Sequence, residues 1–147
     1  MKKIIGKVML LLLCLVVSIS IYGEEQPGTL RITVNGIRGS SGSIRVALYS
    51  EEKSFLDEEK VYQSKTAKVV GDEVRLEFSG LPTGEYAVAV FHDENSNKKL
   101  DTNFLGIPNE AYGFSNGPHG AFGPPSFKDA KVTMNEDSGL DIVVTIK

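Results

Sequence analysis

The sequence predicts an all-β fold, an antiparallel β-sandwich of about seven short strands with one long ordered loop. Two observations carry this prediction. Apolar and polar residues alternate with a period of two in several segments from Thr29 onward, and clusters of Gly, Pro, Ser and Asn separate those segments. No long stretch has the helical spacing of apolar residues. Short strands with turn signals between them are typical of a sandwich.

The first predicted strands occupy residues 30–34 and 44–48. The connection between them, residues 36–42, is rich in Gly and Ser and is expected to be of the hairpin type. Ala67 and Val69 indicate a short edge strand. The apolar residues expected to share one face of the first two strands are Leu30, Ile32, Val34, Ile44, Val46 and Leu48.

Four more strands are predicted at residues 74–78, 86–91, 130–134 and 140–146. The segment 86–91 is apolar on both faces, as expected of a central strand that is covered on each side. The others alternate and are expected to bury one face only.

Two connections differ in character. Residues 50–62 carry many charges and are expected to form a solvated connection with one helical turn that tucks Phe55 inward. Residues 102–126 lack periodicity but hold five Gly, four Pro and four aromatic residues. Loops this long are usually functional or disordered, and disordered segments are poor in aromatics. We therefore expect an ordered excursion whose aromatic side chains form a small core.

Residues 1–23 are predicted to be a secretory signal peptide. A basic start precedes an apolar run of 14 residues, 8–21, and small residues place the cleavage after Ser20 or Gly23. The run is shorter than the roughly 18 residues of a spanning helix, which leaves an uncleaved anchor as the alternative. Cys14, the only cysteine, is expected to leave with the signal.

Residues 24–147 are expected to form a single domain in the periplasm or outside the cell. Signal removal takes three of the 16 basic residues and none of the 19 acidic ones, so the net charge moves from −3 to about −6. Nucleic acid is therefore excluded as a favoured partner, and so is the membrane after signal cleavage.

Oxygen-bearing side chains stand at every second position just after the 86–91 strand, which is how a short loop wraps calcium. The loop is not an EF-hand, because Lys98 stands where that motif needs Gly and Phe104 where it needs Glu. The alternative is a polar turn in which Asp and Asn side chains bond their own backbone. The predicted calcium ligands are Asp93, Asn95, Asn97, the carbonyl of Lys99, and Asp101, with Glu110 as a weaker candidate.

Enzymatic constellations are scarce, so the protein is expected not to be an enzyme. No cysteine remains after signal cleavage to act as a nucleophile, and no serine lies in a G-x-S-x-G motif. The two histidines, His92 and His119, are not spaced as in a compact zinc motif. A hydrolase or metalloenzyme that uses them is the remote alternative.

Two stretches carry a family resemblance. Residues 81–86, Leu-Pro-Thr-Gly-Glu-Tyr, resemble the L-P-x-G-x-Y signature of prealbumin-like and Cna-B-type sandwich domains. The motifs from His92 to Ala130, among them His-Asp-Glu-Asn, Gly-Ile-Pro, Tyr-Gly-Phe-Ser-Asn and Phe-Gly-Pro-Pro-Ser-Phe, resemble the family called domain of unknown function 2141. This resemblance covers residues 30–147. It implies an exported bacterial Ig-like sandwich and no established activity, and the family's usual Gly is replaced by Lys98.

The sequence thus predicts an exported, non-enzymatic module that binds calcium structurally in the 93–101 loop. Few carboxylates contribute, so the expected dissociation constant is about 10⁻⁴–10⁻³ M. The alternative is a module without metal that binds a cell-envelope glycan, peptide or protein through residues 102–127.

Overall fold

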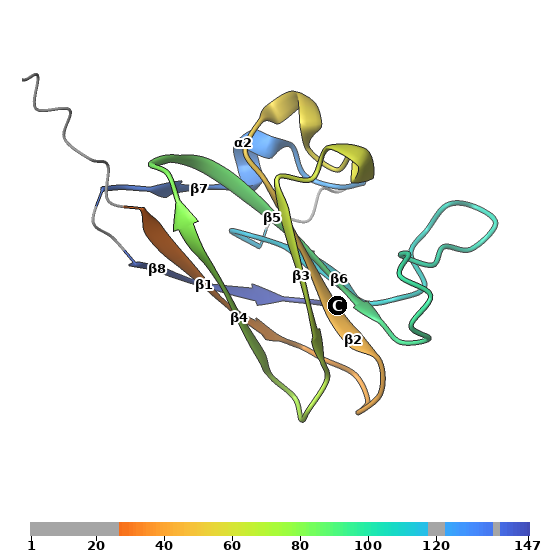
Figure 1. The fold of residues 1–147 in the computed structure, drawn as a ribbon. Helices are drawn as coiled ribbons and strands as arrows, with labels where there is room; N and C mark the ends of the chain where they lie inside the picture. The colour runs from red at the N-terminus through yellow and green to blue at the C-terminus, as the bar shows by residue number, and fades with distance from the viewer. Residues whose placement is uncertain (1–26, 118–122, 137–138) are drawn as a thin grey trace, which may run out of the picture.

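The computed structural model describes residues 27–117, 123–136 and 139–147, which form two β-sheets packed face to face (Figure 1). The smaller sheet has the order β4-β1-β8, with β1 (Gly28–Asn35), β4 (Val74–Leu81) and β8 (Gly139–Thr145). The larger sheet has the order β3-β2-β5-β6, and β7 also pairs with β5; its strands are β2 (Ser43–Tyr49), β3 (Gln63–Lys68), β5 (Gly84–Asp93), β6 (Tyr112–Phe114) and β7 (Lys131–Met134). The prediction of an all-β sandwich is confirmed.

The sandwich core lies between the sheets and consists of the apolar side chains that the period-two alternation predicted to face inward. Leu30, Val34, Ile44 and Leu48 are all completely buried, and Phe78 joins them from β4. The edge position of β3 is as predicted, and so is the central position of β5. The alternation therefore identified the inward face of each strand.

Two predictions about the arrangement of the strands are wrong. Residues 36–42 do not close a hairpin, because β1 and β2 belong to different sheets and this segment crosses between them. Period-two alternation identifies a buried face but not the neighbouring strand. In addition, β1 pairs with β8 in parallel, so the sandwich is not wholly antiparallel. The crossing needs Gly42, which has φ of 80° and whose Cβ would lie 2.3 Å from the Asp93 carbonyl oxygen.

A second apolar cluster covers the outer face of the larger sheet. The 50–62 connection forms two 3₁₀ turns, η1 (Glu52–Ser54) and η2 (Glu58–Lys60), and a short helix α2 (Phe127–Ala130) precedes β7. The ring of Phe55 packs against Tyr49, Phe114 and Phe127 at centroid distances of 5.5, 6.3 and 5.8 Å. The predicted inward position of Phe55 is confirmed, and β5 is indeed covered on both sides.

The long loop contains a strand that was not predicted. Strand β6 pairs with β5 from Ala89 to Phe91, while β7 pairs with an earlier stretch of the same edge. Thr102 and Pro108 form an isolated bridge that closes a tight excursion. Phe104 lies at its tip with 95% of its surface exposed, so its expected place in a small aromatic core is wrong. Phe122 lies outside the described residues.

The predicted signal peptide, with Cys14, also lies outside the described residues. Within the part of the chain that the structure describes, no helix has the length and apolar character needed to cross a membrane.

Candidate binding pocket and the loop beside it

The loop after β5 is organised by the carboxylate of Asp93, whose side chain is 1% exposed. Its two oxygens accept the backbone N–H groups of Asn97 and Lys98, each at 3.0 Å. Lys98 has φ of 70°, so it makes the sharp left-handed turn for which Gly is better suited. The turn therefore forms although Lys98 occupies this position.

Two of the other predicted ligands, Asn95 and Asn97, contact the carboxylate of Asp101. The side-chain amides of Asn95 and Asn97 donate to its oxygens at 2.5 and 2.8 Å. The amide oxygens of the same two residues accept backbone N–H groups, from Asn97 at 2.9 Å and from Lys99 at 2.8 Å. Asn95, Asn97 and Asp101 therefore form one hydrogen-bonded network. The bonds from the backbone to the two Asn side chains are the polar-turn bonds of the alternative interpretation.

Glu110 closes the base of this loop. The residue is buried, with 7% of its surface exposed. The two oxygens of its carboxylate accept the backbone N–H groups of Glu94 and Asp101, each at 3.0 Å. Asn109 adds a backbone bond of 2.8 Å to the carbonyl of Asp101. One carboxylate therefore joins the beginning and the end of the loop.

The donor set of this loop suits a hard cation in chemistry, since it offers carboxylate and amide oxygens. Among the described residues, no group of three or more His, Cys, Asp and Glu side chains could hold a metal ion. Calcium would therefore depend on the oxygens of Asn95 and Asn97, whose amides must rotate so that oxygen replaces nitrogen toward Asp101. His92 is completely buried beside the loop: its Nε2 donates to the Ser41 carbonyl at 2.8 Å, and its Nδ1 lies 3.9 Å from the Glu94 carboxylate. His119 lies outside the described residues.

A pocket of about 630 Å³ lies on the outer face of the larger sheet. Its floor follows from the strand register. Ala47 on β2 pairs with Ala89 on β5 and with Ser64 on β3, so three small side chains lie in one row across the sheet. Side chains on the same face of neighbouring strands lie next to each other, and these small ones leave a furrow. Phe114 on β6, the partner of Ala89, ends the row.

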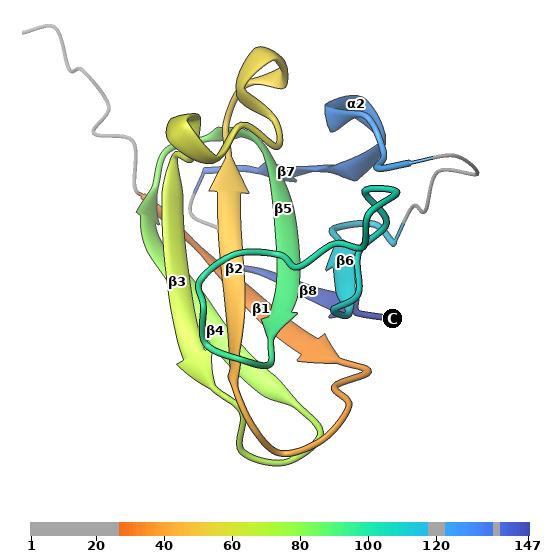
Figure 2. The ribbon, with the colours of Figure 1, turned by 90° about the vertical axis from the view of Figure 1, so that its right-hand side faces the viewer.

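The walls of the pocket come from segments far apart in the chain. The segment after β5 passes across β2 and β5 in Figure 2 before it reaches β6, and it contributes Lys98, Leu100 and Ile107. The 50–62 connection, which forms the two 3₁₀ turns, contributes Leu56 and Glu58 from the opposite side. Pockets of this volume, apolar with a few polar groups, are the usual form of small-molecule sites.

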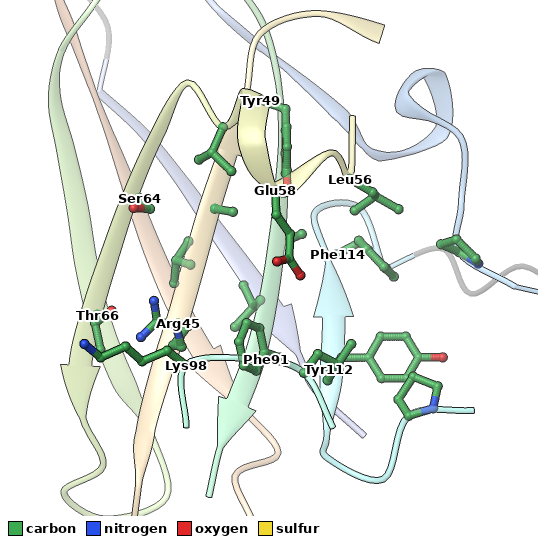
Figure 3. A pocket seen from close by; sticks show the side chains of 18 of the residues that line it. Arg45, Tyr49, Leu56, Glu58, Ser64, Thr66, Phe91, Lys98, Tyr112 and Phe114 are labelled. Atoms are coloured by element: carbon green, nitrogen blue, oxygen red, sulfur yellow. The ribbon is translucent and has the colours of Figure 1, made fainter. Parts of the chain in front are cut away.

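Polar and charged groups stand at the ends of the pocket, as Figure 3 shows. Arg45, Thr66 and Lys98 lie toward one end in this view, and Tyr49 and Glu58 toward the other. Burial raises the pKa of the Tyr49 hydroxyl, and the carboxylates of Glu58 and Asp57 raise this pKa further. Tyr49 therefore remains a neutral hydrogen-bonding group at ordinary pH.

A model of the family described as uncharacterised proteins conserved in bacteria, DUF2141, matches residues 32–141, which is most of the chain. The chain belongs to the DUF2141 family. Searches of curated proteins and of solved structures returned no match. The matched span in this DUF2141 chain includes the loop, Glu110 and the pocket floor.

Sequence reasoning missed the pocket of this DUF2141 protein. Ala47 and Ala89 were expected only as strand residues, and nothing in their spacing shows that they are cross-strand partners. The available signal was the small size of both residues on strands otherwise rich in large side chains. Without the register, that signal does not locate a cavity.

Proposed function

We propose that the protein is an exported, non-enzymatic binding module that takes a small ligand in the pocket on the outer face of its larger sheet. The observation that carries the proposal is the furrow formed by Ser64, Ala47 and Ala89, walled by the loop after β5 and by the 50–62 connection. This develops the predicted alternative of a module that binds a cell-envelope glycan or peptide through residues 102–127, because Ile107, Pro108 and Tyr112 line the same pocket.

The proposal is tested with N-phenyl-1-naphthylamine, an uncharged apolar probe whose fluorescence rises in apolar surroundings. The domain of residues 24–147 is expected to give a saturable rise with one site. Ala47→Phe fills the furrow and is expected to remove most of this rise. Val143→Phe is the matched control, because Val143 is a 59% exposed strand residue on the other sheet. Equal binding by the wild type and Ala47→Phe, or no saturable binding, would contradict the proposal.

An Ig-like or prealbumin-like classification of the sandwich is a further part of the proposal. The hydroxyl of Tyr86 donates to the carbonyl of Pro82, four residues upstream, at 2.9 Å. A tyrosine that bonds the backbone a few residues before it resembles the tyrosine corner of Ig-like sandwiches. This bond supports the classification.

Structural calcium binding in the 93–101 loop is the second candidate function. Its support is the convergence of Asn95, Asn97 and Asp101 in one network and the left-handed turn at Lys98. With a dissociation constant of about 10⁻⁴–10⁻³ M, 10 mM calcium is expected to stabilise the domain by about 1–3 kcal/mol. The melting temperature should then rise by several degrees in differential scanning calorimetry.

Magnesium at the same concentration controls for ionic strength, and Asp101→Asn removes one of the two loop carboxylates in the predicted ligand set. The calcium candidate predicts a shift with calcium only, reduced in Asp101→Asn. A shift that is equal for both ions, or unchanged in the variant, would reject calcium and leave the loop as a hydrogen-bonded turn.

A further inference from the structure

One end of the pocket is basic, although the chain as a whole is acidic. The chain has 19 acidic and 16 basic residues, yet two basic side chains, Arg45 and Lys98, lie together at one end of the pocket, and Glu58 lies toward the other. A cationic cleft in an acidic protein concentrates anions at that point of the surface. This end of the pocket is therefore complementary to a negatively charged group.

Both of these cations have donors available for a ligand. The Arg45 guanidinium forms a long ion pair of 4.0 Å with the buried Asp93 carboxylate and, among the described residues, donates no hydrogen bond. Asp93 already receives two backbone N–H groups. Lys98 forms no ion pair within the described part of the chain, whereas the ammonium of Lys65, which also lines the pocket, lies 5.6 Å from the centre of the Phe78 ring, on the side of the core. Arg45 and Lys98 are therefore the cations that a ligand can engage.

The backbone at Lys98 gives an independent reason to assign it a role. Its φ of 70° is a left-handed conformation, which costs an L-residue with a Cβ and not Gly. Strained residues are retained where the surrounding structure or a function requires them. The side chain of Lys98 lies at the same end of the pocket as Arg45 (Figure 3), and Leu56, which also lines the pocket, shares this left-handed conformation.

We propose that the pocket binds a small amphipathic carboxylic acid, an apolar chain or ring that carries one carboxylate. This inference rests on the proposed function and adds the ligand class to it. The apolar body lies in the furrow of Ala47 and Ala89 against Phe114, and the carboxylate lies between Arg45 and Lys98. The carboxylate of Glu58 toward the other end disfavours a second anionic group on the ligand.

The test displaces bound N-phenyl-1-naphthylamine with decanoate, decanol or decylammonium, each below its micelle-forming concentration. The three compounds share one alkyl chain and differ only in the head group. Decanoate is expected to bind at least about tenfold more tightly than decanol, the range of a hydrogen bond to a charged group. Decylammonium is expected to be the weakest of the three.

Lys98→Gln is expected to remove most of the preference for decanoate over decanol. Lys99→Gln is the matched control, since Lys99 is an exposed neighbour in the same loop that does not line the pocket. Arg45→Gln provides a second variant on a strand, with the same expected loss of preference.

The outcomes separate this inference from the proposed function. Saturable binding of the uncharged probe with equal affinities for decanoate and decanol would overturn the carboxylate inference. It would still support the pocket as a ligand site. A preference that survives both Lys98→Gln and Arg45→Gln would also overturn it. Absence of probe binding to the wild-type domain would overturn both.

Discussion

Replacing Glu110 with alanine is expected to lower the free energy of unfolding by about 3 kcal/mol. The substitution removes two hydrogen bonds from backbone N–H groups to one buried carboxylate, and a hydrogen bond to a charged group contributes about 1.5–3 kcal/mol. Because the loop is partly exposed, water replaces some of the lost bonding, which places the expected value at the lower end of the sum. Urea denaturation followed by circular dichroism measures the change.

Two further variants define the role of Glu110. Glu110→Gln keeps one good acceptor and is expected to lose about half as much. Glu94→Gln changes an exposed side chain of the same loop, whose backbone N–H and not its carboxylate contacts Glu110, and is expected to stay within about 0.5 kcal/mol of wild type. A loss of less than about 1 kcal/mol in Glu110→Ala would show that Glu110 does not hold the loop.

Replacing Phe114 with alanine is expected to lower the free energy of unfolding by about 3–4 kcal/mol, as other deletions of buried Phe side chains do. Phe114 is 6% exposed and its ring meets Phe55 and Tyr112 at centroid distances of 6.3 and 5.8 Å. It also ends the row of side chains that forms the pocket floor. The variant is therefore expected to lose both stability in urea and affinity for the uncharged probe.

Phe104→Ala is the matched control for Phe114→Ala. Both residues lie in the long loop predicted from sequence, but Phe104 is 95% exposed. Its removal is expected to change the free energy of unfolding by no more than about 0.5 kcal/mol. Similar losses in the two variants would contradict the assignment of Phe114, and not Phe104, to the outer apolar cluster.

The inward faces of the strands could be predicted because burial follows a period of two. Leu30 and Ile44 are buried as the alternation requires. The pairing of the strands could not be predicted in the same way. The parallel pair of β1 and β8 joins residues from the two ends of the domain, and no local pattern encodes which distant strands become neighbours.

The predicted metal loop shows the same division. The structure brings the Asn97 and Asp101 side chains into contact, while the Asp93 carboxylate accepts the backbone N–H groups of Asn97 and Lys98, and calcium binding by these residues stays a prediction. The spacing did not indicate what their oxygens bind, because carboxylates and amides serve cations and backbone N–H groups equally well. The two hydrogen bonds from backbone N–H groups to Glu110 also could not be predicted from the sequence, because they depend on how the loop returns to β5.

We propose above all that the furrow of Ser64, Ala47 and Ala89 is a ligand site. The most direct test is a ¹H–¹⁵N NMR titration of residues 24–147 with N-phenyl-1-naphthylamine. We expect shift changes to concentrate on that row and on Phe114, with β1, β4 and β8 nearly unchanged. Changes centred on those three strands, or spread evenly over the domain, would contradict the claim.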